Sequence, residues 1–144
     1  MSIKVSIDAS GGDFGFPVTI SAGINALISF SDLHINLVGD EKEIKEELEK
    51  KSIHKSFLDR IEITHASEVI NMKDSPSTAL RHKKDSSMRV AINLVQSGIS
   101  DACVSAGNTG ALMSIARFVL KTIEGVDRPA IMSAFPTLTG PTHV

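Results

Sequence analysis

Hydrophobic and polar residues alternate at the start of the chain with a period of two. Ile3, Val5 and Ile7 are apolar, and the residues between them are Lys4 and Ser6. Because successive side chains of a strand point to opposite faces, this pattern predicts a β-strand. Later short apolar runs predict four more strands, at residues 35–38, 61–64, 102–105 and 130–135.

Between these runs, apolar residues recur at helical spacing. Such a recurrence places them on one face of a helix. Three stretches show it, and their apolar positions are Ile20, Ile24, Leu27 and Ile28, then Met88, Ala91 and Val95, then Leu112, Ile115, Ala116 and Val119. The charged stretch described next adds a fourth helix. Five strands alternating with four helices predict an α/β fold with a mainly parallel sheet flanked by helices.

Residues 41–51 predict a helix that is mostly exposed to solvent. Ile44 and Leu48 are expected to be its only residues that point inward. Its charges are spaced to form three i,i+4 ion pairs in the favourable order, Glu41–Lys45, Glu46–Lys50 and Glu47–Lys51. We interpret this charge run as a plain solvated face.

Composition and charge narrow the class of protein. The chain has 144 residues, which is enough for about one domain. The formal net charge of -2 gives no general attraction to nucleic acid or to an anionic membrane. Cys103 is the single cysteine, so no disulfide forms within the chain, and no apolar run approaches the roughly 20 residues of a membrane span. These features predict a cytoplasmic protein.

The last residues predict an interrupted fold. Gly140 and Pro141 are typical of a turn, and residues 142–144 read as the start of another strand. Because domains seldom stop inside such a run, we expect residues 1–144 to be the N-terminal portion of a single, truncated α/β domain.

Candidate chemistry lies in the loops that follow strands, where ligands bind in open α/β sheets. The first such loop spans residues 8–17 and contains Gly11, Gly12 and Gly15. These glycines let the backbone approach a ligand, although the loop lacks the Lys-Ser/Thr ending of a nucleotide-binding P-loop. The alternative interpretation is a tight turn with aspartates that cap it.

The second loop spans residues 105–111 and leads directly into a predicted helix. Its small residues allow successive backbone N–H groups to face one concavity, and a helix N-terminus adds partial positive charge. Ser105, Asn108 and Thr109 supply uncharged hydrogen-bonding groups. Such a loop suits a phosphate or a developing oxyanion. The alternative is that Asn108 or Thr109 only caps the helix.

The third loop, residues 74–89, is basic and rich in hydroxyl groups. Ser86 or Ser87 is expected to cap the helix that follows, and Gly98 to end it. The alternative interpretation is a solvated surface loop. Nucleic-acid binding is disfavoured because no aromatic residue is interleaved and the net charge is negative.

Other candidates are weaker. The histidines lack the spacing of metal ligands, and one cysteine cannot build a thiolate site, so neither a metal nor a cofactor is expected. Cys103 lies within an apolar strand and is interpreted as a small core thiol. His65 ends the third predicted strand, and we expect a structural role for it.

Long segments of the chain resemble the PlsX-type phosphate acyltransferases. Residues 8–15 resemble that family's Asp-Ala-Met-Gly-Gly-Asp-x-Gly opening, with Ser10 where Met is usual. Residues 74–89 resemble its Asp-Ser-Pro-Ser-x-Ala-Leu-Arg-x-Lys-Lys-Asp-Ser-Ser-Met-x segment, and residues 101–112 its Asp-Ala-Cys-Val-Ser-Ala-Gly-Asn-Thr-Gly-Ala-Leu segment. The motifs occur in the family's order over essentially the whole chain, which ends near the middle of a family member's length.

The resemblance implies a Rossmann-like α/β/α fold similar to phosphotransacetylases and isopropylmalate-type dehydrogenases. It implies transfer of an acyl group from an acyl carrier protein thioester to inorganic phosphate, giving acyl-phosphate for phospholipid synthesis. It further implies a homodimer, a membrane acyltransferase as partner, and peripheral association with the membrane. Because phosphate is itself an anionic nucleophile, no acyl-enzyme is needed and Cys103 need not react.

Site residues follow from the loops and the resemblance together. We assign catalytic roles to Asn108 and Thr109, and phosphate or oxyanion binding to Ser105, Gly107 and Gly110, with Gly11 and Gly12 as the opposing wall. The basic residues are expected either to offset the phosphate charge or to meet an acidic carrier protein, and they are Arg81, Lys83, Lys84 and Arg89. For Lys83 and Lys84 we favour the carrier.

Two alternatives remain open. One is an inactive, truncated fragment of such an acyltransferase. The other is a phosphate-binding relative among the dehydrogenases and phosphotransacetylases, although the chain shows neither a Gly-x-Gly-x-x-Gly loop nor a set of metal-binding carboxylates.

Overall fold

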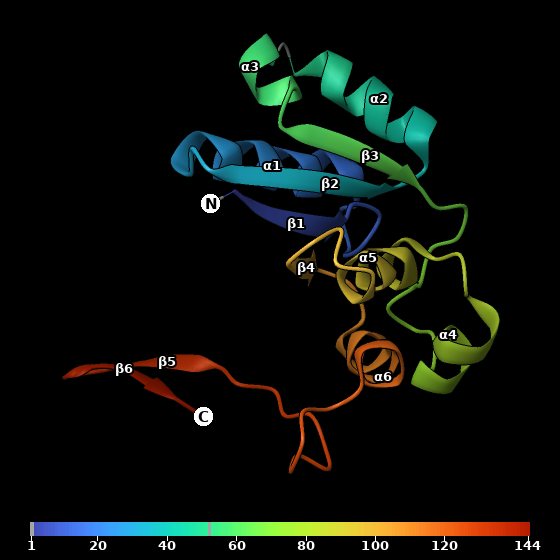
Figure 1. Ribbon diagram of the computed structural model, residues 1–144, viewed down its shortest axis with the longest axis vertical. Helices are drawn as coiled ribbons and strands as arrows, with labels where there is room; N and C mark the ends of the chain where they lie inside the picture. The colour runs from blue at the N-terminus through green and yellow to red at the C-terminus, as the bar shows by residue number, and fades with distance from the viewer. Residues whose placement is uncertain (1, 52) are drawn as a thin grey trace.

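The computed structural model describes residues 2–51 and 53–144 and has a parallel sheet at its centre (Figure 1). The sheet consists of β1 (Ile3–Asp8), β2 (Leu33–Gly39), β3 (Ile61–His65) and β4 (Ala102–Ser105). Its strand order is β3-β2-β1-β4, and every pair of neighbours is parallel. The predicted α/β fold is therefore confirmed, with these four strands at the predicted places.

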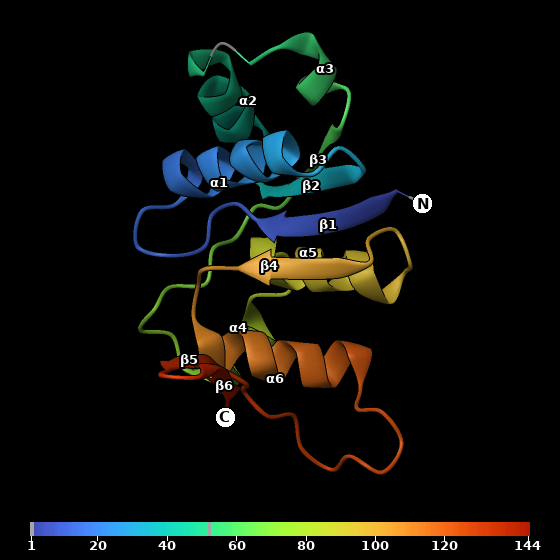
Figure 2. The same ribbon diagram turned by 90° about the vertical axis from the view of Figure 1, so that its left-hand side faces the viewer.

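Helices cover both faces of the sheet (Figures 1 and 2). On one face lie α1 (Phe16–Ser29), α2 (Glu41–Lys50) and the short α3 (Lys55–Leu58). On the other lies α5 (Ser87–Gln96), and α6 (Thr109–Leu120) and α4 (Pro76–His82) form a further layer against it. Residues 35–39 of β2 are all buried, because a central strand between two helical layers is covered on both sides.

Alternation along β2 divides the core into the two sides of the sheet. Ile35 and Leu37 pack with Ile20 and Leu27 of α1 and Ile44 of α2. Val38 points the other way and packs with Ala91 of α5. A third cluster holds α4, α5 and α6 together through Ala79, Met88, Ile92, Ala111 and Ile115. This third cluster fixes the position of the start of α6, which forms part of the candidate site described below.

The ion pairs of the charged helix α2 match the prediction only in part. The pairs Glu41–Lys45 and Glu47–Lys51 form as expected. Lys50, however, pairs with Glu47, and Glu46 lies near Lys42, so the expected Glu46–Lys50 pair is wrong. Glu47 is buried alongside Ile44, so the expectation that only Ile44 and Leu48 point inward is wrong. Two lysines pair with Glu47 at once and compensate its charge there.

Helix ends follow the expected residues in α5 but not in the basic segment before it. Ser86 caps α5, and Gly98 adopts a left-handed φ of 72° just beyond its end. Residues 74–89 are only partly a loop, because α4 begins at Pro76 after the cap residue Ser75. Proline at the first helical position fits this start, since its missing N–H would have no partner in the helix.

The predicted strand at residues 130–135 is wrong in extent and in partner. Residues 130–133 are irregular, and β5 (Ala134–Thr137) pairs antiparallel with β6 (Gly140–His143), apart from the parallel sheet. The turn lies at residues 138–139, not at Gly140-Pro141. Pro136 and Pro141 face each other in this hairpin, and proline cannot donate to the ladder of a central strand.

Within the described residues, no helix is both long and apolar enough to cross a membrane.

Candidate functional site

The site lies where the connections of the sheet diverge, between β1 and β4. From β1 the chain proceeds through α1 to β2 on one side, whereas β4 lies on the other side of β1 and leads into α6. Asp8 ends β1 and pairs in register with Ser105, which ends β4. Ligands of open α/β sheets bind at such a switch point, beyond the carboxyl ends of the strands. The first and second predicted loops meet there.

A buried carboxylate joins the two strand ends to α5. Asp8 is only 2% exposed, and its Oδ1 accepts from the Ser87 hydroxyl at 2.6 Å. Its Oδ2 accepts from the Ser105 hydroxyl at 2.7 Å. Burial raises the pKa of Asp8 above its ordinary value of 3.8, and the two hydroxyl donors oppose that rise.

Glycines let the two loops approach this carboxylate and each other. A Cβ on Gly11 would lie 2.5 Å from Asp8 Oδ2, which is inside van der Waals contact. Gly12 has a φ of 89°, and a Cβ there would lie 3.1 Å from the carbonyl oxygen of Ala106. Gly11 and Gly12 therefore form a wall directly against the loop between β4 and α6.

The N-terminus of α6 presents free backbone donors. Asn108 caps the helix by accepting from the N–H of Ala111 at 3.0 Å. Among the hydrogen bonds of the described residues, none engages the N–H groups of Thr109 or Gly110. Thr109 is exposed, and the helix dipole adds partial positive charge at this end. Two unpaired donors at a helix N-terminus are suited to an anion.

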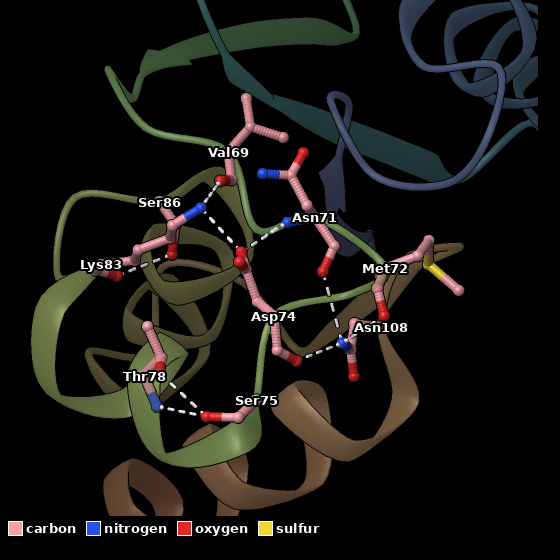
Figure 3. Close-up of polar contacts among 9 residues, drawn as sticks. All are labelled: Val69, Asn71, Met72, Asp74, Ser75, Thr78, Lys83, Ser86 and Asn108. Carbon is pink, nitrogen blue, oxygen red and sulfur yellow. Dashed lines mark hydrogen bonds and ion pairs between the residues drawn. The ribbon is translucent and has the colours of Figure 1, made fainter.

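The amide of Asn108 has a second role that the sequence did not reveal (Figure 3). Its Nδ2 donates to the carbonyl oxygens of Asn71, Met72 and Asp74, at 3.3, 3.1 and 2.9 Å. These bonds hold the segment before α4 over the β4–α6 loop. The side chain of Asn108 thus has its oxygen on α6 and its nitrogen on three carbonyl groups, so it positions the loop instead of presenting a donor to solvent.

Lys83 is held within the protein and is not a free surface cation (Figure 3). Its Nζ lies 2.7 Å from Asp74 Oδ2 and donates to the carbonyl oxygen of Val69 at 2.6 Å. Asp74 also accepts from the N–H of Asn71 at 2.8 Å. The Lys83 hydrogen bond, followed by that of Asn71, lowers the pKa of Asp74 below 3.8.

The other three basic residues differ in their surroundings. Arg81 and Lys84 are exposed. Arg89 lies over the ring of Phe118, with its guanidinium carbon 5.3 Å from the ring centroid. Phe118 is nine residues beyond Thr109, roughly 13 Å along α6. The structure therefore brings Arg89 to the last turn of α6 and not to the loop at its N-terminus.

Two hollows flank Gly12 and Asp13. One, of about 370 Å³, is lined by Ser10 and by residues 69–73. The other, of about 210 Å³, reaches Ala106 of the β4–α6 loop. The Ser10 hydroxyl is buried and, within the described residues, has no hydrogen-bond partner. The second hollow thus lies between the β1–α1 loop and Ala106 of the β4–α6 loop.

Cys103 and His65, the two weaker candidates, lie in surroundings that favour structural roles. Cys103 is half-buried against the core, and burial, with a smaller effect of Asp8, raises the pKa of its thiol. A raised pKa disfavours the nucleophilic thiolate. His65 accepts from the N–H of Glu41 at 3.3 Å and so lies at the start of α2.

Comparison with known proteins identifies the family. The family model described as "Fatty acid synthesis protein" matches residues 3–144. The chain belongs to this family. A phosphate acyltransferase of Vesicomyosocius okutanii subsp. Calyptogena okutanii is 63% identical over 144 residues, which is all of this chain and 42% of that relative. The phosphate acyltransferase of Methylococcus capsulatus is 56% identical over 140 residues, 97% of this chain and 41% of the relative. The chain thus spans about 42% of the length of such relatives of the fatty acid synthesis protein family.

Proposed function

We propose that the protein transfers an acyl group from an acyl carrier protein thioester to inorganic phosphate, and that phosphate binds at the N-terminus of α6. Membership of the fatty acid synthesis protein family, and the similarity to proteins named phosphate acyltransferase, support the reaction. The site is supported by the N–H groups of Thr109 and Gly110 at the switch point of the sheet, which have no hydrogen-bond partner among the described residues.

The reaction needs positioning and charge stabilisation more than a protein nucleophile. A phosphate oxygen attacks the thioester carbonyl carbon, the C–S bond breaks, and the proton of hydrogen phosphate passes to the sulfur of the departing carrier thiol. Holding phosphate and thioester in contact lowers the entropic part of the barrier, and N–H donors stabilise the oxyanion that develops. The hollows beside Gly12 are the proposed place of the thioester.

The contacts of the site residues change the roles that we propose for some of them. Thr109 and Gly110 supply N–H donors, while Asn108 positions the loop, because its amide nitrogen already donates to three carbonyl groups. Arg81 and Lys84 are the exposed cations that we propose to meet the acidic carrier protein. Cations on a surface act mainly on the association rate.

We also propose three further properties that the resemblance to this family implies. They are a homodimer, a membrane acyltransferase that receives the acyl-phosphate, and a cytoplasmic protein at the membrane periphery. The mass of the native protein in solution tests the first of these directly.

The experiment removes one donor without breaking the helix. Thr109→Pro deletes the N–H at the first helical position, where proline is favoured, and Asn108 already has the extended backbone that precedes proline. Thr109→Ala is the matched control, because it removes the hydroxyl and keeps the N–H. Acyl-phosphate formation is measured in the full-length protein with varied phosphate.

We expect Thr109→Pro to lower kcat/KM for phosphate by about 10²-fold, as loss of an oxyanion donor does, and Thr109→Ala to have a clearly smaller effect. Equal kinetics in the proline variant and the wild type would reject the site. Absence of acyl-phosphate in the wild-type protein would reject the reaction.

A second candidate is that the 144-residue chain by itself is inactive. The phosphate acyltransferases it resembles extend well beyond the matched 42% of their length. Acyl-phosphate formation by the purified 144-residue chain, at the rate of a full-length relative, would contradict this candidate.

A further inference from the structure

The carboxylate of Asp8 lies directly behind the proposed phosphate loop, and the proposed reaction has no use for it. Both of its oxygens accept from serine hydroxyls, and the backbone packs closely around it at Gly11 and Gly107. Within the described part of the chain, Asp8 forms no ion pair. A buried carboxylate without an ion-pair partner among the described residues is costly, so its position calls for an explanation.

The Asp8 carboxylate determines where the hydroxyl hydrogen of Ser105 points. A serine hydroxyl has one hydrogen to donate and two lone pairs that accept. The hydrogen of Ser105 goes to Asp8 at 2.7 Å, and one lone pair accepts from the N–H of Gly107 at 3.0 Å. One lone pair remains. Toward anything that binds in front of it, Ser105 is therefore an acceptor and not a donor.

Ser105 is also the one of the two serines that a ligand can reach. Ser87 is 1% exposed and lies beneath the carboxylate, whereas Ser105 is half-buried at the start of the β4–α6 loop. The other titratable group that faces Asp8 is the Cys103 thiol on β4, which stays neutral because burial raises its pKa. Among the described residues no cation pairs with Asp8, so nothing cancels the charge that its carboxylate carries when ionised.

We infer that the Asp8–Ser105 pair makes the site selective for a protonated oxyanion, hydrogen phosphate, over one without a proton, such as sulfate. This inference rests on the proposed function, because it assumes that phosphate binds at the N-terminus of α6. The P–OH group donates to the free lone pair of Ser105, while the unprotonated oxygens face the N–H groups of Thr109 and Gly110. Sulfate carries no proton at neutral pH, so one of its oxygens would face the Ser105 lone pair and the Asp8 charge.

The test compares the two anions in the full-length protein at pH 7.5. The dissociation constants of inorganic phosphate and of sulfate are measured by calorimetry. An acceptor that the bound anion covers without offering a donor costs enough that we expect sulfate to bind at least about tenfold more weakly than phosphate. Ser105→Ala removes the acceptor and should bring the two constants within about threefold, chiefly by weakening phosphate.

Ser87→Ala is the matched control. It removes the other hydroxyl from Asp8 but leaves the Asp8–Ser105 hydrogen bond, so both anions should keep the wild-type ratio of affinities. Melting temperatures of both variants separate loss of binding from loss of folding.

The outcomes separate this inference from the proposed function. Equal affinity of wild-type protein for sulfate and phosphate, with acyl-phosphate still formed, would overturn the selectivity and leave the reaction standing. An unchanged ratio in a folded Ser105→Ala variant would overturn it too. If the wild-type protein neither binds phosphate nor forms acyl-phosphate, the proposed function itself fails.

Discussion

Asn108 connects three parts of the site through one side chain. Its oxygen caps α6, and its amide nitrogen holds residues 71–74 over the loop. From the sequence, Asn108 was expected to cap the helix or to donate to phosphate, and the cap is confirmed. The bonds to residues 71–74 join positions 34 to 37 residues apart in the chain, so a local pattern could not predict them.

Replacing Asn108 tests this double role. We expect Asn108→Ala to lower the free energy of unfolding by about 1–3 kcal/mol, because a helix cap is lost and the carbonyl groups of residues 71, 72 and 74 lose their donor. Asn108→Asp keeps the capping oxygen but turns a carboxylate oxygen toward those carbonyl groups. Urea unfolding should therefore show the aspartate variant to be destabilised as well. A fully stable aspartate variant would mean that the contacts with residues 71–74 contribute nothing.

The Asp74–Lys83 pair predicts a dependence of stability on pH. Hydrogen bonding to Lys83, and then to Asn71, lowers the pKa of Asp74 below 3.8 in the folded protein. A group with a lowered folded pKa stabilises the fold above its unfolded pKa, and that contribution is lost as the pH falls through the folded value. The wild type should thus melt above Asp74→Asn at pH 7, and the gap should close below about pH 3.8. Lys83→Met should behave in the same way, and a gap that is constant with pH would argue against the pair.

At the scale of elements, the loop between β1 and α1 depends on two features of one glycine. Gly12 has a left-handed φ of 89° and also lies against Ala106. Gly98 has a similar φ of 72°, but a Cβ there would meet nothing within 4 Å. This pair of positions separates backbone strain from close approach.

We expect Gly98→Ala to cost about 1 kcal/mol, from the left-handed conformation alone. Gly12→Ala should cost more than Gly98→Ala in the same chemical unfolding experiment, and it should also weaken phosphate binding, because the wall must move away from the β4–α6 loop. Equal costs with unchanged phosphate affinity would show that the approach of Gly12 to Ala106 is not needed.

Helices and strands were predicted correctly where the sequence shows one clear apolar periodicity. β1 to β4 and the helices α1, α2, α5 and α6 follow from apolar periodicity and helix caps. α4 was missed, although Ser75-Pro76 is a helix start, because the charges around it suggested a loop. Residues 130–135 contain enough apolar side chains for a strand, but prolines on both sides of the turn exclude a central one.

At the scale of the whole molecule, residues 2–120 and the hairpin β5–β6 differ in how many of their side chains are buried. Every residue from 120 to 144 is exposed, including Phe135 at 55%. Figure 1 shows the hairpin extending away from the sheet and its helices. The buried Asp8–Ser87–Ser105 cluster, by contrast, joins residues 79 and 97 positions apart. The segments that contain these residues were singled out from the sequence, while only the folded arrangement revealed that Asp8 joins them.

This difference predicts uneven protection from hydrogen exchange in the 144-residue chain. An isolated two-stranded hairpin is marginally stable in water, so its amides should exchange with deuterium well before those of β1 and β2. Deleting residues 134–144 should leave the melting temperature of the remainder unchanged within error. Protection of β5 equal to that of β2 would contradict this expectation.

The most direct test of the central claim is a crystal structure of the full-length protein with inorganic phosphate. We expect phosphate oxygens within about 2.7–3.2 Å of the N–H groups of Thr109 and Gly110, and one oxygen at hydrogen-bond distance from Ser105 Oγ. Phosphate bound elsewhere, with the N-terminus of α6 unoccupied at saturating phosphate, would contradict the account.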